Sequence, residues 1–241
     1  MSYKPEFISP NFLSSASEVN PKSEMKIEYF PYSDEWGYWT IDNLWTNFED
    51  YVKLSSLSPA TPASWCDFSS NWMHKQNILT VQIEKIRSVM IDFNNEYIKK
   101  NVNIKGFKCW SNIVEPNSFY VVPSWTTRPH TDSHIENNSL IFNTWMSEDS
   151  NGGTAFWKSK EEGYTSSYEN EHKYVEYIKG TVGCGVNIWS NFQGDDHYEK
   201  LAETPSNYGK VIVYTGAQWH SPVVNDITSF RWSHVVSTTS D

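Results

Sequence analysis

The sequence has few basic residues. Its 19 Lys and Arg stand against 29 Asp and Glu, which gives a formal net charge of −10 at pH 7. Proteins that bind DNA or RNA neutralise phosphates with Lys and Arg, and this chain contains no run of either residue. We therefore expect no nucleic-acid partner.

Cysteine is also scarce. The three cysteines, Cys66, Cys109 and Cys184, are far apart, and none belongs to a CxxC pair. This pattern speaks against a zinc ribbon and against a disulfide framework. It is typical of small buried thiols in a reducing compartment.

Long apolar runs are absent as well. No run approaches the roughly 18 apolar residues that a membrane-spanning helix requires, so no contact with a membrane is expected. Residues 1–20 lack the apolar segment of a signal peptide. Together with the cysteine pattern, this predicts a cytoplasmic protein.

Aromatic residues, by contrast, are abundant. They make up 16% of the 241 residues, and 12 of them are tryptophans. We expect most of them to fill a core between two sheets. A chain of this length without an obvious linker is expected to form one domain, residues 1–241, and to bury roughly 70–75% of its unfolded surface.

Residues 1–106 are predicted to form an N-terminal arm and supporting helices. Residues 1–24, polar and rich in Ser and Pro, are expected to be irregular. Asp42 is a plausible N-cap for the first of two helices. The expected elements are strands at 27–30 and 36–41, a short helix at 44–54 and a longer helix at 78–100. The longer helix carries one apolar stripe, formed by Leu79, Ile83, Ile86, Met90, Phe93 and Tyr97.

From residue 107 onward the pattern is strand after strand. The expected strands are 107–114, 118–123, 140–146, 154–157, 185–190, 210–215 and 231–237. Many short strands separated by Gly, Pro and Asn turns favour a jelly roll or double-sheet barrel. The predicted fold is therefore mainly β with flanking helices, a cupin-like double-stranded β-helix over residues 107–238 with an insertion at 158–207.

One short motif suggests chemistry. His130 and Asp132 are two residues apart at the exit of an apolar stretch, so both could turn toward one metal ion. His220, far down the chain, is the best candidate for a third ligand. Two histidines and one carboxylate on one face of an octahedron leave the other positions open, as in non-haem Fe(II) oxygenases. The alternative is a surface bend stabilised by Asp132.

Arg231 and Ser233 extend this interpretation. They begin the last expected strand, and their spacing puts both side chains on one face of it. An Arg that points into a barrel needs an anion, and a guanidinium pairs with a carboxylate through two hydrogen bonds. The pair could therefore hold a dicarboxylate bound to the metal. The alternative is a surface salt bridge for Arg231 and a solvated Ser233.

Taken together, these motifs resemble those of the Fe(II)- and 2-oxoglutarate-dependent dioxygenases. The resemblance rests on His130-x-Asp132, His220, Arg231-x-Ser233, the Gly-Gly step at 152–156 and the strand 208–214 that leads to His220. The Gly-Gly step looks like that of the prolyl-hydroxylase-like members, and the chain also resembles the small phage and marine bacterial branch. The resemblance covers roughly residues 107–238.

The resemblance implies a site as well as a fold. Fe(II) would be held by His130, Asp132 and His220, and 2-oxoglutarate would chelate the iron with its far carboxylate on Arg231. Because Asp132 is present, the halogenase variant, which lacks this carboxylate, is disfavoured. Tyr120 lies where relatives often place a tyrosine that contacts the co-substrate.

Several other residues are candidates by position. Asn143 interrupts an apolar strand and could contact the co-substrate, although cross-strand hydrogen bonding is an equal alternative for Asn143 and for Tyr120. His134 could contact a metal ligand without binding the metal itself. The insertion has no strong apolar stripe, so it is not expected to pack in the core; it could be a lid over the pocket, a surface excursion or an oligomer contact. Five residues could line the substrate mouth: Trp125, Arg128, Trp145, Trp157 and Trp219.

Three functions from different classes follow. The first is a 2-oxoglutarate-dependent hydroxylase acting on a small molecule or a protein side chain. The second is a cupin-like metalloenzyme that does not use 2-oxoglutarate and has no need of Arg231. The third is a metal-free jelly-roll module for binding or assembly. Metal content separates the third from the others, and succinate release separates the first from the second.

Overall fold

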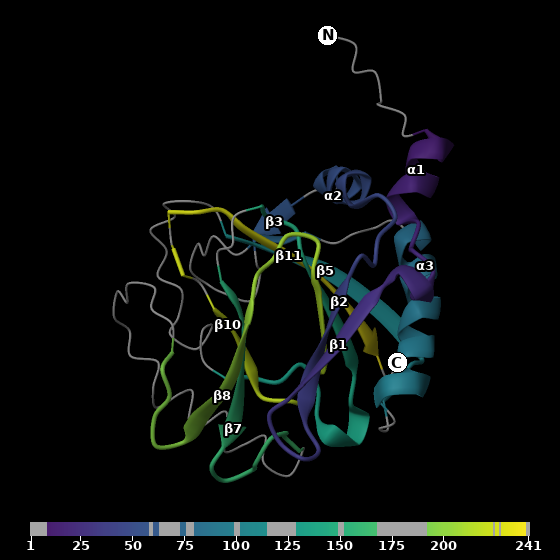
Figure 1. The fold of residues 1–241 in the computed structure, drawn as a ribbon. Coiled ribbons are helices and arrows are strands. Elements are labelled where there is room, and N and C mark those ends of the chain that lie inside the picture. The colour runs from purple at the N-terminus through teal and green to yellow at the C-terminus, as the bar shows by residue number, and fades with distance from the viewer. Residues whose placement is uncertain are drawn as a thin grey trace.

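Two antiparallel sheets face each other in the computed structural model (Figure 1). It describes residues 9–57, 60–62, 73–75, 80–98, 102–114, 129–148, 152–167, 192–223, 225–226 and 228–239. The larger sheet has the order β1-β2-β9-β6-β11-β5-β4-β3, and the smaller has the order β10-β7-β8. From β5 onward the chain passes back and forth between the sheets, which confirms the predicted mainly-β jelly roll, a double-stranded β-helix with flanking helices.

The strands of the larger sheet are β1 (Lys26–Pro31), β2 (Gly37–Asp42), β3 (Ala60–Pro62), β4 (Met73–Lys75), β5 (Gly106–Val114), β6 (Leu140–Trp145), β9 (Val211–Thr215) and β11 (Arg231–Thr239). Those of the smaller sheet are β7 (Gly153–Ser159), β8 (Tyr198–Pro205) and β10 (His220–Val223). The predicted strands that fall on described residues are all present within a few residues of their expected bounds. The segments 118–123 and 185–190 lie outside the described residues.

The N-terminal region corrects two predictions. Residues 1–24 were expected to be irregular, but α1 (Pro10–Ser17) is a helix, followed by the 3₁₀ turn η1 (Lys22–Glu24). Ser9 caps α1, since its hydroxyl accepts a hydrogen bond from Phe12 N at 3.1 Å, and a proline near the first helical position is favourable. The N-cap of α2 (Phe48–Ser56) is Asn47 rather than Asp42, because Asp42 is the last residue of β2.

The predicted long helix is confirmed as α3 (Thr80–Phe93), which continues into the π-turn η2 (Asn94–Ile98). Ile86, Met90 and Phe93 are buried against the outer face of the larger sheet. Figure 1 shows α3 lying along the side of the molecule that carries β1 and β2. None of the helices among the described residues is long and apolar enough to cross a membrane.

The two faces of the larger sheet have different neighbours. On β6, Leu140 and Phe142 pack toward the helices, whereas Ile141 and Trp145 pack toward the smaller sheet. Since side chains alternate along a strand, Asn143 also points between the sheets. On β11, the same alternation turns Ser233 inward together with Val235, and Trp232 outward. Polar side chains of the two central strands therefore meet in the interior.

The smaller sheet explains the Gly-Gly step before β7. Gly152 has a φ of 112°, a conformation that other residues rarely adopt. A β-carbon on Gly153 would overlap the carbonyl oxygen of Thr204 on the neighbouring β8. Gly153 thus allows β8 to pair closely with β7, and a β-carbon on Gly152 would overlap Val223 O on β10.

That pairing overturns one prediction. The insertion was expected to have no role in the packed core, yet β8 lies within it and its Tyr198 is buried edge-to-face against Trp219. Strand pairing with β7 therefore places part of the insertion inside the fold.

Candidate metal centre

His130, Asp132 and His220 converge on one point. One potential ligand atom from each side chain lies within 4.8 Å of the other two. The two histidines come from segments that pair through their backbones: His130 N donates to His220 O at 2.8 Å, and His220 N donates to His130 O at 2.9 Å. This bridge extends the smaller sheet and sets both rings side by side, with centroids 4.5 Å apart.

The turn that carries Asp132 is held against the end of β9. Asp132 N donates to Gly216 O at 2.8 Å, and Gly216 N donates to Ser139 O at 2.8 Å. A β-carbon on Gly216 would meet the Ser139 hydroxyl and lie 2.7 Å from Ser133 Oγ. Only glycine therefore lets the Asp132 turn approach this closely.

This packing yields a first prediction. Gly216→Ala should push the 132–133 turn away from β9 and weaken divalent metal binding by about tenfold or more, the scale found for residues that orient metal ligands. The measurement is a metal titration of the purified variant. Gly163→Ala is the control: Gly163 has a φ of 82° but open space around it, so this variant should lose some stability and keep its metal affinity. Equal affinities in both variants would contradict the prediction.

The hydrogen bonds of His220 define its tautomer. Its Nδ1 lies 2.9 Å from the backbone oxygen of Gln218, and because a carbonyl oxygen only accepts, Nδ1 carries the proton. The Nε2 lone pair then faces Asp132 Oδ2 at 3.4 Å. Two electron-rich atoms at this separation are well placed to share a cation, so the residues fit a divalent metal.

Asp132 is prepared as an anionic ligand. Burial by itself would raise the pKa of Asp132, but when His220 Nε2 also carries a proton, the charge of His220 and its hydrogen bond, followed by the charges of His130 and Lys108, lower that pKa to about 2. Its side chain is 23% exposed, against 5% for His220. The carboxylate is therefore ionised at neutral pH, and one side of the cluster remains accessible.

The start of the insertion braces the same turn. Ser166 N donates to Ala217 O at 3.0 Å, and Trp219 N donates to Tyr164 O at 3.1 Å, so residues 164–166 run beside the segment that leads to His220. The Ser166 hydroxyl lies 3.0 Å from Thr131 Oγ1 and 2.9 Å from His134 Nδ1. Ser166 thus links the segments on both sides of the metal cluster. A lid was predicted for part of the insertion 158–207; residues 168–191 of it lie outside the described residues, so that role stays a prediction.

Arg231 is a buried cation in the same interior. It is 2% exposed, and its guanidinium stacks on the ring of Trp145 at 4.8 Å. Its Nη2 donates to Gly153 O at 3.5 Å. Burial lowers the pKa of Arg231 to about 10, so the side chain stays charged at neutral pH. A charge in such a place favours an anionic ligand.

Polar atoms near Arg231 are available to a ligand. Ser233 Oγ and Asn143 Oδ1 are buried and have no hydrogen-bond partner among the described residues. The same holds for Trp145 Nε1, which lies directly across from Ser233 in the register of β6 and β11. Buried polar groups are usually hydrogen-bonded, so this arrangement is what a bound polar molecule would complete.

Tyr214 links the two halves of the site, and sequence reasoning did not single it out. Its ring centroid lies 4.8 Å from that of His220. Burial and the charge of Asp132 raise the pKa of Tyr214 well above its ordinary value, while Arg231 acts in the opposite direction. Tyr214 therefore presents a neutral hydroxyl within the electrostatic reach of both charges. Its signal was its place two residues before Gly216 on an inward-facing position of β9.

Strand register relates the metal cluster to Arg231. On β10, His220 pairs with Phe156 and Val223 pairs with Gly153, and Gly153 O accepts the hydrogen bond from Arg231. The guanidinium therefore contacts β7, the strand that pairs with the strand beginning at His220.

The remaining candidates divide into two groups. Trp145, Trp157 and Trp219 are almost fully buried, and Trp157 Nε1 donates to Ser221 Oγ at 2.9 Å. Their predicted place at a substrate mouth stays a prediction. Tyr120, Trp125 and Arg128 lie outside the described residues, so their roles stay predictions as well.

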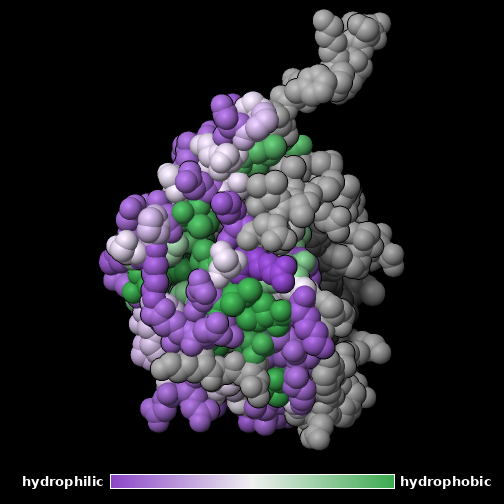
Figure 2. Space-filling model, turned by 90° about the vertical axis from the view of Figure 1, so that its right-hand side faces the viewer, coloured by the Kyte–Doolittle hydropathy of each residue, from purple (hydrophilic) through white to green (hydrophobic). Residues whose placement is uncertain are grey.

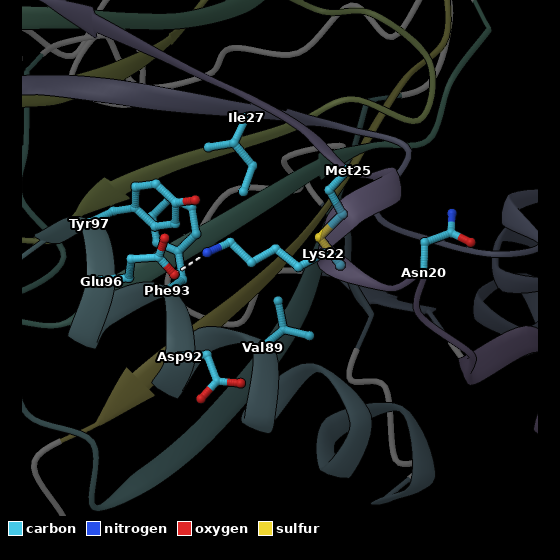
Figure 3. Close-up of a pocket in the computed structure, with 9 residues that line it drawn as sticks. All are labelled: Asn20, Lys22, Met25, Ile27, Val89, Asp92, Phe93, Glu96 and Tyr97. Carbon is cyan, nitrogen blue, oxygen red and sulfur yellow. Dashed lines mark hydrogen bonds and ion pairs between the residues drawn. The ribbon is translucent and has the colours of Figure 1, made fainter.

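A separate pocket lies on the other side of the larger sheet, between η1, β1 and α3 (Figure 3). Its volume is about 210 Å³, and Lys22 reaches across it to Glu96. The residues that line it are Asn20, Lys22, Met25, Ile27, Val89, Asp92, Phe93, Glu96 and Tyr97. Figure 2 shows this side of the molecule, where apolar patches alternate with hydrophilic ones. Neither the metal cluster nor Arg231 contributes to this pocket.

One protein-family model matches the chain. It is described as a family of unknown function, DUF6445, and covers residues 122–233, somewhat less than half of the chain. The three candidate metal ligands, Arg231 and Ser233 all lie within the matched span. No curated protein matches the sequence.

Solved structures with a similar course of the chain include the following three. HygX from Streptomyces hygroscopicus, bound to nickel, 2-oxoglutarate and hygromycin B, has a TM-score of 0.48 and 8% identity and covers 86% of this chain and 84% of its own. SnoN, a non-haem α-ketoglutarate-dependent epimerase of nogalamycin biosynthesis, has a TM-score of 0.46 and 14% identity, and the match covers 78% of this chain and 70% of SnoN. A Pseudomonas putida prolyl-4-hydroxylase has a TM-score of 0.38 and 11% identity, and the match covers 75% of this chain and 77% of the hydroxylase.

Each of these three likenesses falls below a TM-score of 0.5, so none supports a functional inference here. What the chain itself displays is a double-stranded β-helix that brings two histidines and a carboxylate together beside a buried arginine.

Proposed function

We propose that this protein is an Fe(II)- and 2-oxoglutarate-dependent oxygenase that hydroxylates its substrate. The observation that carries the proposal is the pairing of two features in one interior. The His130–Asp132–His220 cluster can hold a divalent metal, and the buried Arg231 donates to Gly153, which pairs with Val223, three residues after His220 on β10. The order and spacing of these residues in the sequence support the same function.

The residues divide the work of binding. His130, Asp132 and His220 would hold Fe(II) on one face and leave its other positions open for co-substrate and dioxygen. When bound, the iron and 2-oxoglutarate supply the oxidising chemistry of the class. Arg231 holds the far carboxylate of 2-oxoglutarate through charge-assisted hydrogen bonds, with Ser233 Oγ as a further donor. Tyr214 is kept neutral by its surroundings, so its hydroxyl can donate a hydrogen bond to a ligand that lies between the metal and Arg231.

Two observations favour this function over the alternatives. A cupin-like metalloenzyme that does not use 2-oxoglutarate has no need for Arg231, a buried guanidinium suited to pairing with a carboxylate. A metal-free binding module has no need for three ligand atoms within 4.8 Å of one another. The substrate is a small molecule or a protein side chain, and the cytoplasm is the proposed location.

The test is a turnover assay. The protein, loaded anaerobically with Fe(II), is supplied with 2-oxoglutarate and oxygen, and succinate and CO₂ are measured. We expect the two products in equal amounts, slowly because no substrate is present, and dependent on both iron and oxygen. Metal binding without succinate release would favour the second function. A protein that binds no divalent metal would favour the third.

A further inference from the structure

We propose that Gln218 and Tyr32 position the metal ligand His220, so that the tip of the N-terminal β1–β2 hairpin is part of the metal centre. The inference rests on the proposed function only in so far as the site must hold a metal. It assigns a role to Tyr32, which lies outside the 107–238 core to which the sequence motifs are confined.

Gln218 holds His220 directly. Its backbone oxygen accepts the proton on His220 Nδ1 at 2.9 Å, which orients the imidazole and leaves Nε2 for the metal. In metal sites, the partner of this second ring nitrogen fixes both the tautomer and the ring orientation. The position of the Gln218 carbonyl therefore sets the direction of a metal ligand.

The Gln218 side chain anchors that carbonyl on two sides. Its Oε1 accepts from Thr215 N at 2.8 Å and from Thr215 Oγ1 at 2.9 Å. Its Nε2 donates to Gly37 O at 3.0 Å and to the hydroxyl of Tyr32. The side chain is 1% exposed, and each amide atom makes two hydrogen bonds, which is the full capacity of a glutamine. An amide held in this way has one orientation.

Tyr32 is itself fixed. It follows β1, and its backbone N donates to Trp36 O at 3.0 Å, which closes the hairpin turn. Its ring lies between Phe156 on β7, with centroids 5.6 Å apart, and Tyr164, with centroids 6.2 Å apart. Burial raises the pKa of Tyr32, so its hydroxyl stays neutral and can accept from the Gln218 amide. The hairpin tip therefore contacts the His220 segment through a partly buried hydrogen bond.

The hairpin offers a matched control. Tyr38 lies on β2 of the same hairpin, and its ring stacks on Phe156 with centroids 5.1 Å apart. Among the described residues, its hydroxyl makes no hydrogen bond to Gln218. Tyr32→Phe and Tyr38→Phe each remove one hydroxyl from an aromatic ring against Phe156, but only the first removes a contact to the metal centre.

The experiment compares Tyr32→Phe, Tyr38→Phe and Gln218→Leu with the unmodified protein. One readout is the affinity for Co²⁺ in an anaerobic titration, and the other is the NMR signal of the His220 Nδ1 proton in the metal-free protein. We expect Co²⁺ affinity to fall about three- to tenfold in Tyr32→Phe, the scale of one hydrogen bond, and about 10–100-fold in Gln218→Leu. Tyr38→Phe should match the unmodified protein in both readouts.

The outcomes separate the two proposals. If Tyr32→Phe keeps both the Co²⁺ affinity and the Nδ1 proton signal of the unmodified protein, the positioning role is overturned, whatever happens to Gln218→Leu. If the unmodified protein binds no Co²⁺, the proposed function fails. In that case the Nδ1 signal still decides whether the hairpin orients His220. A faster-exchanging Nδ1 proton in Tyr32→Phe alone supports the positioning role.

Discussion

Replacement of Asp132 by alanine is expected to abolish tight divalent metal binding. Asp132 supplies the only carboxylate of the three-residue cluster, and its low pKa, about 2, keeps it charged at neutral pH. Without it, two neutral imidazoles remain to compete with water for the metal. We expect the dissociation constant for Co²⁺ or Fe(II) to rise more than a hundredfold, beyond the 10–100-fold typical of residues that only support a ligand.

The control for this variant is Asp92→Ala. Asp92 is an exposed carboxylate on α3 that lines the separate pocket, so its loss changes the net charge equally but leaves the cluster intact. Metal affinity should be unchanged in Asp92→Ala. Circular dichroism on both variants establishes that the fold is retained. A folded Asp132→Ala protein with undiminished metal affinity would show that Asp132 is not a metal ligand.

The second large effect concerns Arg231. Arg231→Leu should raise the dissociation constant for 2-oxoglutarate at least about a hundredfold, because two charge-assisted hydrogen bonds of roughly 1.5–3 kcal/mol each are lost. Metal content should stay the same, since Arg231 is not a ligand. Arg231→Lys should recover part of the affinity: it restores the charge, but an ammonium cannot bind a carboxylate with two parallel hydrogen bonds.

Arg87→Leu is the matched control for Arg231→Leu. Arg87 also places its guanidinium over an aromatic ring, that of Phe107 at 5.3 Å, but it is exposed on α3. Binding of 2-oxoglutarate to the metal-loaded variants, measured by calorimetry under nitrogen, gives the comparison. If the Arg231→Leu protein binds the co-substrate normally, another basic residue must bind its far carboxylate. Arg128 would then be replaced next.

Much of the site could be predicted because its signals are local. His130 and Asp132 are two residues apart, and the alternation of β11 alone turns Arg231 and Ser233 to the same face. The distal histidine followed from its residue type and from the strand before it. The long helix was equally accessible, since its apolar stripe is a property of consecutive turns.

The rest depends on contacts between distant segments. Gln218 meets Tyr32 across 186 positions, and Ser166 meets Thr131 across 35. No periodicity or spacing in one segment reports such a contact. β8 was missed for a related reason: burial along it does not alternate, because two consecutive residues, Glu199 and Lys200, are exposed, so its place in the sheet depends on pairing with β7. The N-cap of α2 was missed because Asp42 and Asn47 are both good caps, and only the end of β2 decides between them.

The most direct test of the central claim is a crystal structure of the protein grown anaerobically with Mn²⁺ and 2-oxoglutarate. We predict a metal ion about 2.0–2.2 Å from a nitrogen of His130, a nitrogen of His220 and an oxygen of Asp132, by analogy with similar N/O sites. The co-substrate should chelate that ion and place its far carboxylate on the Arg231 guanidinium. A metal ion bound elsewhere, or 2-oxoglutarate bound away from Arg231, would contradict the assignment.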